Sequence, residues 1–531
     1  MKKLTKKAIL LILVITAFSA FLTACSTKHF HVYDYETIVE PTCANLGIKR
    51  GVCSCGATKE KSTSALKHKY ENEKCIVCGA TTEEYFNFTL LSDDTYEISA
   101  KDTNNIPVEV VIPSTYKGEA VTSIKEEGFK SCYSLHTIKI LDGVESIGNS
   151  AFQSCYYLRT IILPNSIISI GNNAFYNTAY YQDESNIENG ILYIGRNLIC
   201  AKYITSIQGE YKYSIKEGTF LIADKAFYNR SSTKYIEMPD SLVLIGKEAF
   251  YGCSSLTTVE IPNGVTSIGD GAFQDCPSLK SVKISDKITS IGDRLFYGCG
   301  LLTAVEIPNS VTSIGSRAFS YCSSLTSIEI PSSVTSISDG AFFDCRLLVN
   351  VNYLGTIDDW VQISFSGSNA NPLRYAKQLN INGELVTKVK IISAKQISDY
   401  AFYCYEALTS VEIGDNVKTL GSNVFRGCKS LSSVVIGDGI TSIGKYSFYD
   451  CNSLTSVVLS NSITSIDVYA FYGCNLLSNL YYKGSSSEWS NITIANFNAP
   501  LTKLTKYYYS EGEPTEEGNY WHYVDGEPTK W

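Results

Sequence analysis

Cysteine and histidine side chains are concentrated near the N-terminus, in a pattern that could hold a metal ion. Cys53 and Cys55 form one close pair, Cys75 and Cys78 form another, and 19 residues lie between Cys55 and Cys75. A glycine follows each pair, so that tight turns could bring the thiolates together around a tetrahedral zinc ion. The sequence therefore predicts a structural zinc site at these four cysteines.

The ligand set has alternatives, because one residue rather than two separates the cysteines of the first pair. Cys43, His31 and His68 lie in the same segment and could replace one of them. Disulfide bonds are the competing interpretation, but the five cysteines that follow Cys25 in this segment would leave one thiol unpaired. We interpret residues 25–85 as a zinc-ribbon-like stalk module whose metal would supply folding energy that its small core lacks.

Cys25 lies at the end of an N-terminal export signal. A basic stretch precedes an apolar run over residues 8–24, which is too short to span a bilayer comfortably. The sequence Leu-Thr-Ala-Cys that ends at Cys25 resembles the lipobox of bacterial lipoproteins. The resemblance implies cleavage after a signal peptide of residues 1–24, a lipid on the Cys25 thiol, and an exported protein anchored to the outer face of the membrane by that lipid only. An ordinary signal peptide is the alternative.

The rest of the chain lacks residue patterns that suit catalysis or nucleic-acid binding. A formal charge of −8 and a pI near 5.4 argue against nucleic acid as a partner. Outside the Cys/His-rich segment the only histidines are His136 and His522. The sequence contains no nucleophile elbow, phosphate-binding glycine loop or zinc-protease motif. We therefore expect a binding protein and not an enzyme.

A phenylalanine recurs every 23 residues through most of the chain, in three blocks without slippage. The thirteen positions are Phe129, Phe152, Phe175, Phe227, Phe250, Phe273, Phe296, Phe319, Phe342, Phe402, Phe425, Phe448 and Phe471. In the unit at 256–276, Val259 and Ile261 alternate with polar residues, as in a half-buried strand. A unit this small cannot bury its own apolar face, so we expect successive units to stack with parallel strands around one continuous core.

The repeat Leu-x-x-[Ile/Val]-x-Ile-Pro-x-x-Val-x-x-Ile-Gly-x-x-Ala-Phe-x-x-Cys resembles the BspA-type leucine-rich repeat over residues 115–485. The resemblance implies a right-handed, mainly β solenoid in a bacterial surface protein, and some relatives act as adhesins for host matrix proteins. It implies no particular ligand, because the residues that define the repeat lie in the core. We place the solenoid at residues 86–485.

Ten units place a cysteine three residues after the phenylalanine. Stacked equivalent positions have parallel Cβ directions, whereas the two Cβ atoms of a disulfide must face each other. Buried thiols also behave as small apolar side chains. We therefore predict a column of reduced, buried thiols, with a disulfide ladder as the alternative.

Two insertions interrupt the period, at residues 178–212 and 353–388. For the first insertion, the sequence pattern predicts a hairpin that bulges from the stack. The second contains a tyrosine and a tryptophan seven residues apart, and this spacing recurs near the end of the chain. We interpret the repeated module as a structural splint or cap, and residues 486–531, which are dense in aromatics, as a C-terminal cap.

Binding is expected on the exposed positions of the stacked strands. The outward residues form a column: Glu237, Glu260, Lys283, Glu306, Glu329 and later Glu412. This column predicts a flat, mildly acidic strip for a basic or polar protein, although charged side chains also protect an exposed sheet from unwanted pairing. Aromatic residues of the insertions, Tyr180, Tyr181 and Trp360, form a competing surface that would suit a glycan. We expect protein binding in adhesion or host interaction; the alternative is a structural surface protein associated with glycan or cell wall.

Overall fold

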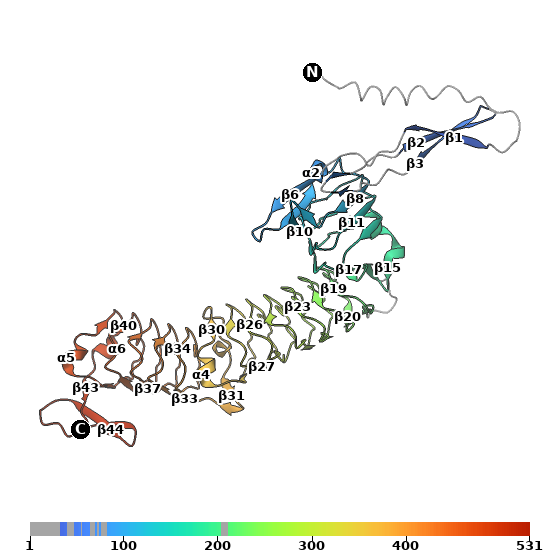
Figure 1. Cartoon of the computed structure of the whole chain (residues 1–531). Helices are drawn as coiled ribbons and strands as arrows, with labels where there is room; N and C mark the ends of the chain where they lie inside the picture. Colours follow the sequence, from blue (N-terminus) through green and yellow to red (C-terminus); the bar gives the residue numbers. More distant parts are fainter. Residues whose placement is uncertain are drawn as a thin grey trace, which may run out of the picture. The chain divides into compact units, whose positions relative to one another are not determined.

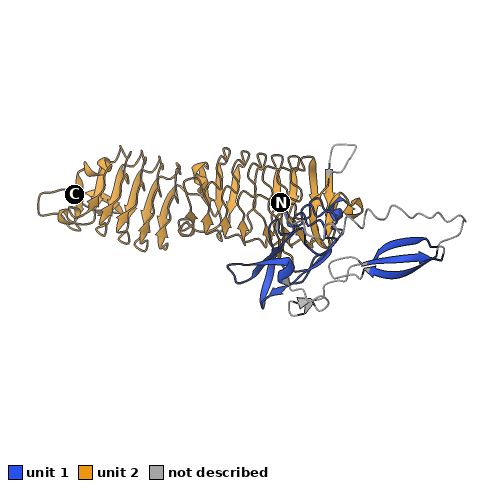
Figure 2. Ribbon diagram, turned by 90° about the horizontal axis from the view of Figure 1, so that it is seen from above, with its two compact units in different colours: residues 1–144, 150–166, 175–182 blue, residues 145–149, 167–174, 183–531 orange. Residues whose placement is uncertain are grey.

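The structure, a computed structural model, describes residues 32–39, 47–54, 56–63, 70–71, 74–75, 82–202 and 211–531. The chain divides into two compact units, which have different colours in Figure 2. Unit 1 comprises Met1–Val144, Ser150–Ser166 and Phe175–Gln182, and unit 2 comprises Glu145–Asn149, Ile167–Ala174 and Asp183–Trp531.

Unit 1 begins with short antiparallel sheets in the Cys/His-rich segment. Strands β1 (Tyr33–Val39), β2 (Gly47–Cys53) and β3 (Thr58–Thr63) pair in chain order, and β4 (Tyr70–Glu71) pairs with β5 (Lys74–Cys75). The next elements are α2 (Thr82–Tyr85), β6 (Phe86–Leu90), β7 (Tyr96–Ala100), β8 (Glu109–Ile112), β9 (Thr115–Tyr116), β10 (Glu119–Ile124), β11 (Thr137–Ile140), β13 (Thr160–Ile162) and α3 (Ala179–Gln182). Parallel pairing starts here, because β7 pairs with β10, and β11 pairs with both β8 and β13.

In unit 2 most turns of the chain contribute two short strands, and equivalent strands of successive turns follow one another in Figure 1. The first strands are β18 (Tyr211–Ser214), β20 (Thr233–Glu237), β22 (Thr258–Glu260), β24 (Ser281–Lys283), β27 (Ser327–Ile330), β29 (Asn350–Tyr353), β31 (Gln378–Ile381), β33 (Lys388–Ile391), β35 (Ser410–Ile413), β37 (Ser433–Ile436), β39 (Ser456–Leu459), β41 (Asn479–Tyr482) and β43 (Lys506–Tyr509). The second strands are β12 (Ser146–Ile147), β14 (Ser169–Ile170), β19 (Leu221–Ile222), β21 (Leu244–Ile245), β23 (Ser267–Ile268), β25 (Ser290–Ile291), β26 (Ser313–Ile314), β28 (Ser336–Ile337), β30 (Ser364–Phe365), β34 (Gln396–Ile397), β36 (Thr419–Leu420), β38 (Ser442–Ile443), β40 (Ser465–Ile466) and β42 (Thr493–Ile494).

The predicted mainly β solenoid with parallel strands and a 23-residue period is confirmed, and the described residues form about 18 turns of it. All thirteen repeat phenylalanines are fully buried. Their rings stack from turn to turn, with centroids 5.0 Å apart for Phe227 and Phe250 and 5.9 Å apart for Phe273 and Phe296. Within each of the three blocks, every ring therefore packs against the ring of the next turn, which joins the turns of that block.

The cysteines form the predicted column of reduced thiols, and each of the ten repeat cysteines is buried. The column also has a role that the sequence did not indicate. Among the described residues, nine of these thiols donate to the carbonyl of the phenylalanine one turn earlier; the Cys276 Sγ donates to the Phe250 oxygen at 3.2 Å. Burial raises the pKa of the Cys253 and Cys345 thiols to about 12. Most of these carbonyls also accept a backbone N–H within their own turn, as the Phe250 carbonyl does from Cys253 at 3.2 Å, so the thiol adds a second hydrogen bond that connects two turns.

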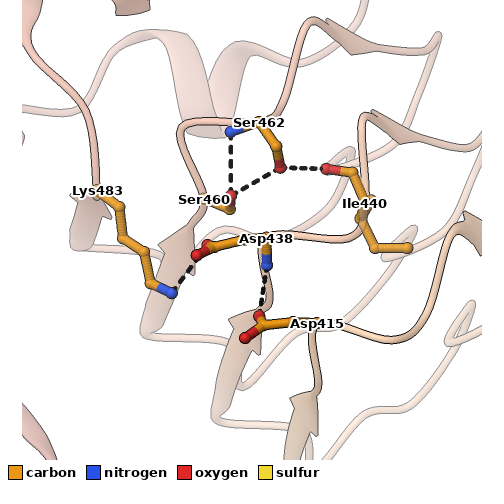
Figure 3. A network of polar contacts seen from close by, with 6 residues as sticks. All are labelled: Asp415, Asp438, Ile440, Ser460, Ser462 and Lys483. Carbon is orange, nitrogen blue, oxygen red and sulfur yellow. Dashed lines mark hydrogen bonds and ion pairs between the residues drawn. The ribbon is translucent and has the colours of Figure 1, made fainter. Parts of the chain in front are cut away.

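Polar side chains connect the turns of the chain in a similar way (Figure 3). The carboxylate of Asp415 accepts a hydrogen bond from the backbone N–H of Asp438, one turn later, at 2.7 Å. The carboxylate of Asp438 in turn lies 3.0 Å from the ammonium of Lys483. The Ser462 hydroxyl donates to the Ile440 carbonyl at 2.6 Å. These contacts satisfy backbone groups between turns, where ladder pairing ends.

The insertion at 178–212 forms the predicted hairpin, but the prediction that it bulges from the stack is wrong. In unit 2 it comprises η1 (Glu184–Asn186), β15 (Ile187–Glu188), β16 (Ile191–Ile194) and β17 (Asn197–Ala201). The three strands pair antiparallel, and β17 pairs in parallel with β19 of the next turn. Ile191 and Leu198 are fully buried. The hairpin therefore replaces part of a turn, because its own apolar residues extend the core.

The insertion at 353–388 is a splint, as its repeated pattern predicted. It contains α4 (Ile357–Trp360), η2 (Pro372–Arg374) and β32 (Glu384–Leu385). The Asp358 carboxylate accepts hydrogen bonds from the backbone N–H groups of residues 392, 393 and 394 at 3.0–3.1 Å. The indole N–H of Trp360 donates to the Ala401 carbonyl at 3.0 Å. The short helix is thereby fixed to the turn that follows it.

The C-terminal segment begins with α5 (Ser486–Trp489) and α6 (Ala499–Thr502) and ends in the hairpin β44 (Tyr520–Val524) and β45 (Glu527–Lys530). Strands β43, β44 and β45 extend the sheet of first strands. Trp521 is fully buried and packs against Val458 and Tyr481 in a small second core. Its indole N–H donates to the Tyr482 carbonyl at 3.0 Å.

The buried thiols predict a loss of stability at alkaline pH. An unfolded thiol ionises near about pH 8.5, whereas the folded Cys253 and Cys345 stay protonated to about 12. Above about pH 8.5 the unfolded chain therefore binds fewer protons than the folded one, so the free energy of unfolding falls by up to about 1.4 kcal/mol per pH unit for each thiol. Urea unfolding followed by circular dichroism across this range measures the slope. The double variant Cys253→Ala/Cys345→Ala should show a shallower slope, and an unchanged slope would contradict this account.

Removal of the Asp358 carboxylate tests the splint. Asp358→Ala leaves three backbone N–H groups without their acceptor, so we expect a loss of about 1–3 kcal/mol in the free energy of unfolding. Asp286→Ala is the matched control, because Asp286 is an exposed aspartate of another turn. Equal urea midpoints for the two variants would show that the insertion does not stabilise the stack.

Candidate functional site

The outward column that the sequence predicted lies exposed on the first strands of unit 2. Glu260 and Lys283 occupy paired positions of β22 and β24, and their charged groups are 2.6 Å apart. Glu237 forms an ion pair with Lys212 on the preceding strand. Glu412, further along the chain, lies 2.8 Å from Lys390. These exposed pairs contribute little stability, because water screens them.

Glu306 and Glu329 differ from these pairs. They face each other on neighbouring turns and are joined by a single parallel bridge. Both side chains are exposed, and within the described ranges neither has an ion-pair partner. Like charges at paired positions of adjacent strands repel each other. A cationic group from outside the chain would relieve this repulsion.

The sheet is interrupted at the same place. Strand pairing stops after β24, and the residues at 304–307 are joined to the next turn only through the Glu306–Glu329 bridge. A hollow of about 900 Å³ lies over this region and is lined by both carboxylates together with Asp286, Asn309 and Leu354. The interruption therefore coincides with a recess in the strand face.

A second hollow of about 790 Å³ adjoins the first, since both are lined by Thr258, Glu260 and Lys283. Its wall also includes Tyr235 and Met238. We call the two recesses together the strand-face hollow. The spacing predicted Glu237, Glu260, Lys283, Glu306 and Glu329 of this lining. It missed the charged residues Lys212, Asp240 and Asp286 and the apolar residues Tyr235, Met238 and Leu354. Tyr235 and Leu354 are large side chains, 41% and 43% exposed, and each lies two residues from a position of the charged column.

The aromatic residues predicted as a competing surface lie elsewhere. Trp360 is fully buried, so the prediction that it forms part of a binding surface is wrong. It fills the core next to Tyr353, with ring centroids 5.3 Å apart. Tyr180 and Tyr181 are half-buried in unit 1, where the Tyr181 ring contacts Tyr176. Trp360 therefore takes no part in a surface with the strand column.

Most of the predicted zinc ligands, and the lipidation site, lie outside the described residues: Cys25, His31, Cys43, Cys55, His68 and Cys78. Cys53 is buried at the end of β2, and its carbonyl accepts a hydrogen bond from the Gly56 N–H at 2.8 Å. The backbone of Cys75 lies in β5. Within the described part of the chain no three potential ligands meet at a metal site, and the zinc site stays a prediction.

No helix within the described ranges is both long enough and apolar enough to span a membrane.

Comparison with known proteins gives matches among bacterial leucine-rich-repeat proteins. The chain is 26% identical to a leucine-rich repeat protein from Bacteroides ovatus, with 80% of this chain and 98% of that chain covered and a TM-score of 0.43. It is 25% identical to a leucine rich cell surface protein from Faecalibacterium prausnitzii, with 81% and 98% covered and a TM-score of 0.32. No curated protein matches.

The sequence profile of the BspA type leucine rich repeat region matches residues 109–221, 221–349 and 395–512 in six copies. These ranges cover more than half of the chain and contain the repeat phenylalanines and thiols described above. Proteins of this type are found at the cell surface. The chain belongs to the BspA-type leucine-rich-repeat family.

Proposed function

We propose that this protein binds another protein through the strand-face hollow, and that this binding serves adhesion or host interaction at the bacterial surface. The observation that carries the proposal is the facing pair Glu306 and Glu329, which lies in a recess and has no ion-pair partner within the described ranges. Leucine-rich-repeat proteins generally bind protein partners.

The surroundings of the carboxylates favour a protein partner. Tyr235, Met238 and Leu354 supply apolar area around the charged residues. Protein interfaces combine such apolar area with a polar rim, and aromatic residues are enriched in them. A lysine or arginine side chain of the partner would lie between Glu306 and Glu329. It would form an ion pair with each carboxylate and so offset the repulsion between the two.

The proposed location follows from the N-terminal sequence. The apolar run that ends at Cys25 supports export, and its lipobox-like end supports a lipid anchor on that thiol. The Cys/His-rich segment would then separate the solenoid from the membrane, with a zinc ion at Cys53, Cys55, Cys75 and Cys78 as its structural metal. We propose no catalytic role, since leucine-rich-repeat families are typically not enzymes.

Reversal of the two charges tests the binding site. The full-length protein is measured against an array of host matrix proteins at low and moderate salt, and saturable, salt-sensitive binding is expected. For Glu306→Lys/Glu329→Lys we expect about tenfold or greater loss of affinity, because a basic partner would then meet two like charges.

The matched control is Glu516→Lys/Glu517→Lys. These two exposed carboxylates lie in the loop between β43 and β44, and their reversal changes the net charge by the same amount. It should leave binding unchanged. An equal loss in both variants would mean that only overall charge matters, and an absence of saturable binding to every matrix protein would contradict the adhesion proposal.

A further inference from the structure

A second group of side chains stands out in the last block of repeats. It comprises Tyr400, Tyr403, Arg426, Tyr446, Tyr449, Tyr469, Tyr472 and Phe497, which we call the tyrosine–arginine array. Tyr472 and Phe497 are 43% and 54% exposed, and the other members are half-buried. The array lies on the segments that carry the repeat phenylalanines, which follow the second strand of each turn. It is therefore separate from the strand-face hollow on the first strands.

The array consists of two columns with regular contacts. One column places Tyr446 against Tyr469 at 5.3 Å between centroids, and Tyr469 against Phe497 at 4.3 Å, with the rings nearly parallel. In the other column Tyr449 stacks on Tyr472 at 5.1 Å. The Arg426 guanidinium lies 4.6 Å from the Tyr449 ring centroid and 5.2 Å from that of Tyr446. Parallel stacking covers ring faces within a column, and Phe497, at the end of its column, is 54% exposed.

The repeat does not require these aromatic residues. Tyr400, Tyr446 and Tyr469 sit two residues before a repeat phenylalanine, with φ of 63°, 58° and 60°. Equivalent positions elsewhere hold smaller or flexible residues with the same backbone: Glu127, Ser150, Asn173, Lys225, Glu248, Gly271, Arg294, Arg317, Gly340 and Asn423. A left-handed backbone is unfavourable for a bulky side chain and suits glycine or asparagine. Such a local backbone cost at three half-buried positions, where other units carry smaller or flexible residues, indicates a function.

The charges around the array indicate what it would bind. Arg374 lies 5.8 Å from the Tyr403 ring centroid, and Lys445 lies 5.0 Å from that of Tyr446. Among the described residues, neither of these cations nor Arg426 has a carboxylate partner within ion-pair distance, and Asp450 is the acidic group next to Tyr449. Asp399 and Asp467 also neighbour the array, but their carboxylates accept hydrogen bonds from the backbone N–H groups of Ser422 and Val468. The three cations lie against the rings without an ion-pair partner in the described ranges, and this favours an anionic ligand.

We propose that the tyrosine–arginine array is a binding site for an anionic polysaccharide, a glycan whose sugar units carry carboxylate or sulfate groups. Guanidinium and ammonium groups would bind the acidic substituents, and arginine matches carboxylate and sulfate geometry with paired hydrogen bonds. Tyrosine hydroxyls would bind sugar hydroxyls, while the apolar C–H face of a sugar ring would pack on Phe497. The turn-to-turn spacing of the rings offers equivalent contacts to successive units of an extended polymer.

The chain itself provides conservative substitutions for the test. In Tyr446→Asn/Tyr469→Asn both tyrosines become the residue that positions 173 and 423 already carry in the same backbone conformation, so the variant should fold. The full-length protein is titrated with polygalacturonate, with heparin and with neutral dextran. We expect salt-sensitive binding to at least one polyanion and none to dextran, with affinity lowered about tenfold or more by the double variant and by Arg426→Gln.

The matched control is Tyr228→Gln/Tyr251→Gln. These tyrosines stack at 4.8 Å in an earlier block, at the position where Gln153 and Gln274 stand in other units. They lack the second aromatic column, so this variant should bind as the wild type does. Equal weakening by the control, equal binding to dextran, or no binding to either polyanion would overturn the proposal. Loss of matrix-protein binding in Tyr446→Asn/Tyr469→Asn without any polysaccharide binding would assign the array to a protein interface instead, and binding at the strand-face hollow could still be intact.

Discussion

Contact between neighbouring turns carries the stability of this protein, because no turn of 23 residues can bury its own apolar side chains. Within each block of repeats every phenylalanine packs on the next one, and nine of the repeat thiols donate to a carbonyl one turn earlier. The core is therefore a line of side chains of which each touches mainly the equivalents before and after it. Insertions are accepted only where they restore this continuity, as Ile191 and Leu198 do in the hairpin and Trp360 does in the splint.

The fold could be predicted almost completely from residue spacing, since the interval between phenylalanines reports stacking directly. The insertions were harder to predict. The pattern of the second one predicted a splint, yet its tryptophan was also assigned to a binding surface, because an aromatic residue in a polar loop looks the same whether it is exposed or buried. Trp360 points into the core, where its indole N–H donates a hydrogen bond to the carbonyl of Ala401, 41 residues later in the chain. Such long-range pairing leaves no local signal in a single sequence.

The candidate site was predictable in part for a similar reason. The charged column follows from the repeat register, so Glu260, Lys283, Glu306 and Glu329 could be placed in advance. The interruption of the sheet near residue 305 could not, because the residues there keep the strand pattern of their neighbours. The sequence contains Tyr400, Tyr446 and Tyr469 at equivalent repeat positions, but the inference of a function for them rests on their positive φ, which only the structure shows.

Because each turn is stabilised by contacts with the turns before and after it, the number of repeats in such a protein can change during evolution. Because equivalent residues of successive turns make the same contacts, a gene that gains or loses one whole repeat by recombination still encodes a continuous core. The positions that form the hollow and the array lie outside the buried phenylalanine and cysteine columns, although Met238 and Tyr400 pack against the core. Substitutions at these positions can therefore change which ligand the protein binds. The gain or loss of whole turns can change the distance between two ligand sites. The buried phenylalanine and cysteine columns must be kept in either case.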